Sequence, residues 1–181
     1  GLGYKNFEVL VLPDHMQEAS FNNPRVKVIP TGVMKPSEKR NIGIKCSNGE
    51  ICALIDADAY PDKDWLRNVI KYFKDCEVAA VGGPGVTPES DFERQKASGL
   101  ILSSRLGGGG LTYRYTSGKM RNDEDLPTCN LVLRKSVLDK LGGFNVNYWP
   151  GEDTYLALQV TRHLNMKMVY APDVVVYHHR R

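Results

Sequence analysis

Cysteine is sparse in this chain, and its four cysteines stand far apart, without a Cys-x-x-Cys pair. Zinc sites and disulfide frameworks need closely or regularly spaced cysteines, so this spacing argues against both. It favours a reducing, cytoplasmic compartment. The chain also lacks an apolar run of the roughly 18 residues that a membrane span requires. Its first residues show no signal-peptide pattern.

A strong excess of charge is missing as well. The formal net charge is +3, with 25% charged and 41% hydrophobic residues, as in ordinary globular domains. So small a charge gives no indication of a nucleic-acid partner. The length of 181 residues suits one domain with a sizeable core. Apolar sequence near both ends predicts that residues 1–181 form a single, incomplete domain of a longer protein.

Short apolar runs alternate with amphipathic runs along the sequence. This alternation predicts an α/β domain with a mostly parallel central sheet and helices on both faces. Strands are expected over residues 7–12, 26–29, 51–55, 78–81, 130–133, 168–170 and 174–177. Helices are expected over residues 37–47, 64–73, 135–141 and 152–163. Residues 89–126 are ambiguous, and the four glycines at 107–110 indicate a mobile loop, a candidate lid.

Asp56 and Asp58 follow the wholly apolar strand expected over residues 51–55. Side chains two residues apart in extended chain point to the same side. Such a pair can bind a divalent cation through oxygen, and the cation would neutralise charge on a phosphate leaving group. The alternative is a polar turn in which Asp62 or Asp64 caps the next helix. The strand directly before Asp56 favours the metal site, because ligands bind beyond the carboxyl ends of parallel strands.

Glu152 and Asp153 stand at the predicted start of a helix. Acidic residues there complement the helix dipole, so capping explains them as well as catalysis does. In the catalytic interpretation, Asp153 is the general base that takes the proton from an acceptor hydroxyl. Cys129 has no evident histidine-based partner, so we expect a buried thiol rather than a nucleophile.

Five further residues are candidates for binding. Lys39 and Arg40, at a helix start, could reach phosphates or form a solvated face. Asp14 follows the first strand and could accept a hydrogen bond from a nucleobase or cap a turn. Asn130 begins a strand and is a candidate for orienting substrate. His178 could complete a metal site with the acidic pair, or belong to a basic surface tail.

The order and spacing of these motifs resemble family 2 glycosyltransferases over residues 6–181. The resemblance implies the GT-A fold, a nucleotide-binding α/β sandwich, and sugar transfer from a nucleoside-diphosphate sugar with inversion. It also implies a magnesium or manganese ion and a saccharide or lipid-linked acceptor. By position, Asp14 would contact the base, Arg40 the nucleotide, Asp58 the metal and diphosphate, and Asp153 would be the base. Asp56 would bind the ribose or metal region, and the donor set would also include Lys39, Asn130 and Glu152. The motifs are Asn6 to Val9, Asp14, Lys39 to Ile44, Gly49-Glu50, Asp56 to Asp58, Asp64 to Leu66, Gly82-Gly83, Cys129-Asn130, Gly142 to Phe144, Gly151 to Asp153 and Tyr177 to His179.

One departure from the family pattern concerns its first β-α unit, which nothing before Tyr4 supplies. The family places that strand inside the sheet, beside the strand that ends at Asp14. Its omission would leave unpaired strand edges, so we expect poor donor binding, no measurable transfer by residues 1–181 alone, and self-association through the gap. The basic ending is similar to members with membrane helices after a cytoplasmic catalytic domain. The alternatives are a non-catalytic nucleotide-binding or scaffold fragment and a nucleotidyltransferase-like enzyme.

Overall fold

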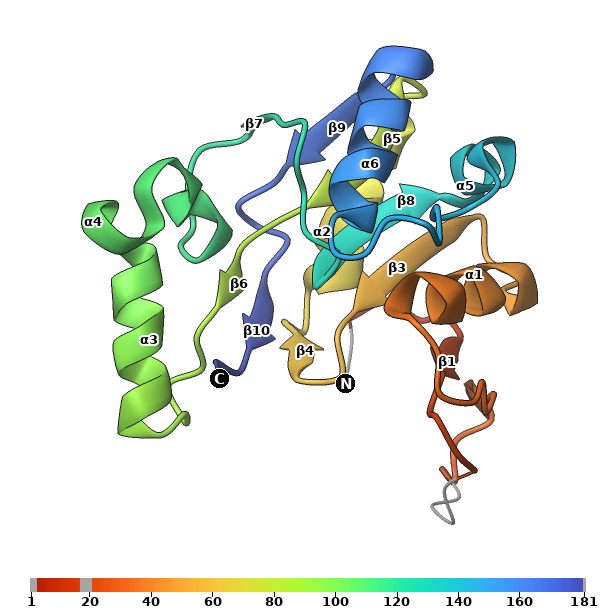
Figure 1. Cartoon of the computed structure of the whole chain (residues 1–181), viewed down its shortest axis with the longest axis horizontal. Coiled ribbons are helices and arrows are strands. Elements are labelled where there is room, and N and C mark those ends of the chain that lie inside the picture. Colours follow the sequence, from red (N-terminus) through yellow and green to blue (C-terminus); the bar gives the residue numbers. More distant parts are fainter. Residues whose placement is uncertain (1–2, 17–20, 181) are drawn as a thin grey trace.

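The computed structural model describes residues 3–16 and 21–180 and shows a mixed α/β fold built on a five-stranded sheet (Figure 1). The order across this sheet is β3, β8, β5, β9, β7. Its strands are β3 (Ile51–Ile55), β8 (Asn130–Arg134), β5 (Val78–Gly82), β9 (Lys167–Tyr170) and β7 (Arg121–Asn122). The sequence Val-Ala-Ala-Val-Gly of β5 is buried throughout, as expected of an apolar run covered on both faces.

The strand directions correct one detail of the expected fold. In the described part of the sheet, β5 pairs in parallel with β9, whereas β8 runs antiparallel to both β3 and β5. Strand β7 also runs antiparallel to β9. Strands β3, β5 and β9 therefore share one direction, but most hydrogen-bonded neighbours are antiparallel. Periodicity in the sequence reveals which faces are buried and carries no information on strand direction.

Helices cover both faces of this sheet, as predicted. On one face, α1 (Pro36–Cys46), α5 (Lys135–Leu141) and α6 (Glu152–Leu158) contribute Ile44, Leu138 and Leu156 to one apolar cluster. On the other face, Trp65 and Val69 of α2 (Trp65–Ile70) pack in a second cluster. Two short helical segments continue these helices, η1 (Lys71–Lys74) after α2 and η3 (Gln159–His163) after α6.

Two smaller sheets flank the central one. Strands β1 (Val9–Val11) and β2 (Val26–Val28) form a parallel pair. Within the described residues, neither strand hydrogen-bonds to β3, which pairs only with β8. One edge of β1 and one edge of β3 thus lack a strand partner among these residues. In the other small sheet, β10 (Val176–His178) lies between β4 (Ala59–Pro61) and β6 (Gly85–Val86).

The glycine-rich stretch is helical rather than an extended loop. After α3 (Glu93–Ser103), residues Arg105–Gly108 form α4 and Gly109–Arg114 form the 3₁₀ segment η2. Ser104 begins α4 by accepting a hydrogen bond from the Gly107 backbone N–H. The predicted mobile loop at residues 107–110 is therefore wrong as a description of the backbone. The part of the chain described here contains no helix long and apolar enough to cross a bilayer.

Candidate active site

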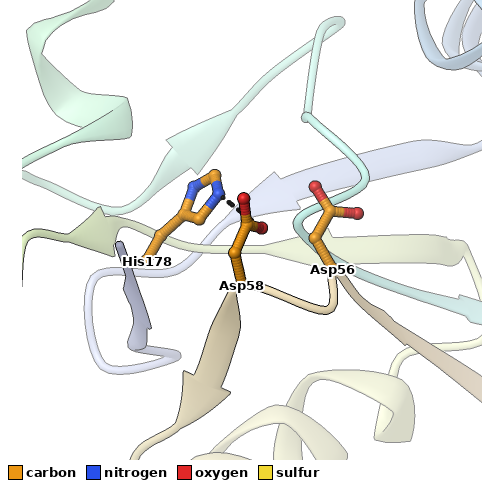
Figure 2. Close-up of side chains that lie close together, drawn as sticks. All are labelled: Asp56, Asp58 and His178. Carbon is orange, nitrogen blue, oxygen red and sulfur yellow. Dashed lines mark hydrogen bonds and ion pairs between the residues drawn. The ribbon is translucent and has the colours of Figure 1, made fainter. Parts of the chain in front are cut away.

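The acidic pair and His178 meet where β3 ends. Asp56 and Asp58 follow Ile55, the last residue of β3, and lead into β4. Strand β10 pairs antiparallel with β4, with His178 opposite Ala59, so the fold places the imidazole beside Asp58. One ligand atom from each of Asp56, Asp58 and His178 lies within 4.8 Å of the other two. Figure 2 shows the His178 ring directed at Asp58, with the Asp56 and Asp58 carboxylates side by side and pointing to the same side of the chain. The predicted trio therefore converges.

The hydrogen-bond partners of His178 indicate which tautomer a neutral ring has in this arrangement. Its Nε2 lies 3.1 Å from Asp58 Oδ1, and its Nδ1 lies 3.3 Å from Arg180 Nη1. A guanidinium can only donate, so Nδ1 accepts and the proton of a neutral ring lies on Nε2, which donates to Asp58. Arg180 is buried, which lowers its pKa, and it also donates to Thr87 Oγ1 and the Gly85 carbonyl. These contacts hold Arg180 in place beside Nδ1 of His178, while Nε2 of the same ring lies at Asp58.

The donor set of this trio fits a divalent cation. Carboxylate oxygens suit Mg²⁺ and Mn²⁺, and an imidazole nitrogen favours a transition metal such as Mn²⁺. Because the ligand nitrogen must be deprotonated, His178 would bind through Nε2 only after its ring proton moves from Nε2 to Nδ1. Asp56 and Asp58 provide the oxygen ligands without that cost.

Arg40 connects the acidic pair to the start of α6. Its Nη1 donates to Glu152 Oε1 at 2.6 Å, and its Nη2 lies 3.7 Å from Asp56 Oδ1. The guanidinium also lies over the Phe144 ring, 5.6 Å from its centroid. The Glu152 side chain is only 5% exposed, so this ion pair is largely removed from water. The Arg40 guanidinium thus links the segment after β3 to the start of α6.

Asp153 follows Glu152 in the first turn of α6, where its Oδ1 accepts the Thr154 backbone N–H. Burial is the main cause that raises the pKa of Cys129 to about 11, and the negative charges of Asp56 and Asp153 both add to the rise. A thiol with this pKa stays protonated at neutral pH, as expected of a residue that is not a nucleophile.

The sequence matches the family model described as Glycosyl transferase family 2 over residues 4–142. The chain belongs to this family. The pre-mycofactocin glycosyltransferase of Mycobacterium tuberculosis is 26% identical over 147 residues, covering 81% of this chain and 30% of the relative. The chain thus spans about a third of the length of that curated relative.

Solved structures confirm the expected GT-A-like fold of this family 2 domain. A mannosyltransferase from Pyrobaculum calidifontis, in complex with GDP-Man and Mn²⁺, superposes with a TM-score of 0.62 at 19% identity. The match covers 95% of this chain and 47% of that protein. GalNAc-T7, with UDP, GalNAc and Mn²⁺, gives a TM-score of 0.68 at 14% identity, covering 96% and 38%. At these identities the likeness establishes the fold alone.

Lys39 and Asp14 lie together in this family 2 domain and form an ion pair. The Lys39 ammonium holds the pKa of the Asp14 carboxyl below its ordinary value. Lys39 also donates to the Leu12 carbonyl at 3.3 Å, so it ties α1 to the end of β1. Both residues were predicted to contact the nucleotide, and in this structure each is the other's partner.

The proposed role of Asn130 in orienting substrate needs correction. Its side chain is fully buried, with 0% of the residue exposed. Its Oδ1 accepts from Trp65 Nε1 at 2.9 Å, and its Nδ2 donates to the Pro84 and Val174 carbonyls. A side chain so placed joins β8 to Trp65 of α2 and to the backbone at Pro84 and Val174, and it has no exposed surface to offer a ligand. Asn130 is a structural residue.

Arg180 is the functional candidate that the sequence interpretation missed, because it stood in a basic run at the end of the chain. Its position two residues after His178 is the feature of the sequence that could have identified it. Residues at that spacing in extended chain share a side. Arg180 therefore supports His178, whereas His179 points to buried Asp91 and contacts its carboxylate.

Proposed function

We propose that this chain is the catalytic core of an inverting glycosyltransferase that moves a sugar from a nucleoside-diphosphate sugar to an acceptor hydroxyl. The observation that carries the proposal is the convergence of Asp56, Asp58 and His178 at the end of β3. Arg40 links this trio to the helix start that bears Asp153. A donor site and a base on adjoining elements are what a direct displacement requires.

In the proposed reaction, Asp153 takes the proton of the acceptor hydroxyl. The acceptor oxygen then forms a bond to the anomeric carbon while the bond from that carbon to the diphosphate oxygen breaks, and the configuration inverts. A Mg²⁺ or Mn²⁺ ion held by Asp56, Asp58 and His178 would stabilise the charge that develops on the diphosphate. The carboxylate form of Asp153 is the one that can act as a base.

The donor class is proposed from the site and from the structural neighbours. The Pyrobaculum enzyme was solved with GDP-Man and Mn²⁺, and GalNAc-T7 with UDP and Mn²⁺. We therefore propose a UDP- or GDP-linked donor for this chain, and a saccharide or lipid-linked acceptor. We also propose that the whole protein is membrane-anchored with this domain in the cytoplasm; recovery of the full-length protein in the soluble cell fraction would contradict this.

The test measures nucleotide binding in the full-length protein. UDP and GDP are titrated by calorimetry with and without Mn²⁺. We expect affinity that depends on Mn²⁺ and that falls more than about 100-fold in Asp58→Asn, since even outer-shell changes cost 10- to 100-fold in metal affinity. The matched control is Asp75→Asn, whose exposed carboxylate pairs with Lys167. Equal affinity in Asp58→Asn and the wild type would refute the metal role.

Product analysis separates this function from its alternatives. A glycosyltransferase releases nucleoside diphosphate from the donor, a nucleotidyltransferase exchanges pyrophosphate, and a scaffold fragment releases neither. We further expect residues 1–181 alone to show no measurable transfer, and robust turnover by them would overturn that expectation.

A further inference from the structure

Three consecutive side chains of α1 each contact a different segment of the candidate site. Lys39 contacts Asp14 and the Leu12 carbonyl at the end of β1. Arg40 contacts Asp56 after β3 and Glu152 at the start of α6. The third residue, Asn41, contacts the loop that leads toward α6. The contacts described above for Lys39, Arg40 and Asn41 are all with other residues of the protein.

Asn41 makes a two-way link to the loop before α6. Its Nδ2 donates to the Phe144 carbonyl at 2.8 Å, and its Oδ1 accepts the Phe144 backbone N–H at 2.7 Å. Paired hydrogen bonds of this kind fix both position and orientation. The same helix turn therefore holds the approach to α6 through Asn41 and the first residue of α6 through Arg40.

The Arg40–Glu152 pair is placed where water contributes little. The Arg40 side chain is 16% exposed and that of Glu152 is 5% exposed. Burying two charges is costly, and such pairs are seldom more stable than apolar residues of the same volume. The location of the Arg40–Glu152 pair gives a reason for it. Through Arg40, the pair joins the segment that carries Asp56 to the helix turn that carries Asp153. Removing one partner would leave the other charge buried and unpaired.

We infer that Arg40 is a positioning residue, which holds the first turn of α6, and with it Asp153, in register with the acidic pair after β3. This inference rests on the proposed function for the role of Asp153. It differs from the assignment of Arg40 to the nucleotide, because the guanidinium is already engaged by two carboxylates and an aromatic ring. Glu152, by the same contacts, is the anchor of α6 rather than a donor ligand.

The test compares Arg40→Gln with the double variant Arg40→Gln/Glu152→Gln in the full-length protein. In the single variant, amide hydrogens of residues 151–155 should exchange faster. The kcat for nucleoside-diphosphate release should fall by about 100-fold, the usual cost of a displacement of about 1 Å. The donor KM and the Mn²⁺-dependent affinity for UDP or GDP should stay within about twofold, because nucleotide contacts are not removed.

The double variant provides the rescue. Two neutral amides can hydrogen-bond to each other and leave no unpaired charge, so both exchange protection and kcat should recover toward wild type. Arg162→Gln is the matched control, since it breaks an exposed arginine–glutamate pair with Glu124 and should change neither quantity.

Two results would overturn the inference. A raised donor KM with weaker UDP and GDP binding in Arg40→Gln, not restored by Glu152→Gln, would make Arg40 a nucleotide ligand. Unchanged exchange at residues 151–155 would show that Arg40 does not hold α6. Lack of transfer by the wild type would instead refute the proposed function, and the exchange result would still decide the positioning role.

Discussion

Glu8 shows how a single side chain ties the two-stranded sheet to the turn after α1. Its carboxylate accepts hydrogen bonds from Lys27 Nζ at 2.8 Å and from the Asn48 backbone N–H at 2.6 Å. These bonds, with that of Lys27 the largest cause, lower the pKa of Glu8 from 4.5 to about 2. A carboxyl whose pKa is lower in the folded state stabilises the fold above its unfolded pKa. That contribution is lost as the pH falls from about 4.5 through about 2.

We expect Glu8→Gln to be less stable than the wild type at pH 7 and to lose less stability between pH 4.5 and pH 2. Urea unfolding across this pH range measures both effects. Glu93→Gln is the control, because that carboxylate is 92% exposed and its partner Lys96 lies on the same helix. Parallel pH profiles for wild type and Glu8→Gln would contradict the assignment.

The predictability of single site residues depended on how near their partners lie in the sequence. Asp56 and Asp58 were predicted because the apolar strand before them and their spacing define a site locally. Asn130 was misassigned because its partners, Trp65 and Val174, lie far away in the sequence. No local pattern separates an amide that faces a ligand from one that closes a core.

At the scale of elements, the loop between α5 and α6 depends on Gly143. Gly142 and Gly143 both have positive φ, at 76° and 85°. A Cβ on Gly143 would lie 2.4 Å from Asn41 Oδ1, the atom that accepts the Phe144 N–H. Gly143 therefore allows α1 to approach this loop closely.

We expect Gly143→Ala to reduce the free energy of unfolding by about 1–3 kcal/mol, from strained backbone and the displaced Asn41 contact. Chemical denaturation gives the value. Gly110→Ala is the matched control, since its Cβ would meet nothing within 4 Å and its φ is not positive. Gly110→Ala should change the free energy of unfolding by no more than about 0.5 kcal/mol. Equal free energies of unfolding for Gly143→Ala and Gly110→Ala would contradict the importance of the close approach at Gly143.

The elements themselves were largely predictable where local signals bound them. The apolar run Ile51–Ile55 and the helix Lys135–Leu141 have the predicted limits, because Gly49 precedes the first and two glycines end the second. The expected strand over residues 7–12 is shorter, Val9–Val11, because strand limits follow the pairing with β2. The antiparallel placement of β8 has no local signal at all.

At the scale of the whole molecule, one edge of β1 and one edge of β3 have no strand partner among the described residues. Free strand edges are templates for pairing with another chain. We propose that residues 1–181 self-associate through these edges, with a mass that rises with concentration in sedimentation experiments. Val9→Lys places a charge on β1, where Val9 is 38% exposed, and should shift the equilibrium toward monomer. A monomer at all concentrations in the wild type would contradict the proposal.

We propose above that Asp153 acts beside the metal trio of Asp56, Asp58 and His178, and cleavage by bound iron tests this placement most directly. Fe²⁺ is added in place of Mn²⁺ to the full-length protein with peroxide, and the hydroxyl radicals cut backbone next to the ion. We expect cuts at residues 56–58, at residue 178 and at residues 151–153, all absent in Asp58→Asn. Cuts at the first two segments with none at residues 151–153 would place Asp153 elsewhere and contradict the account.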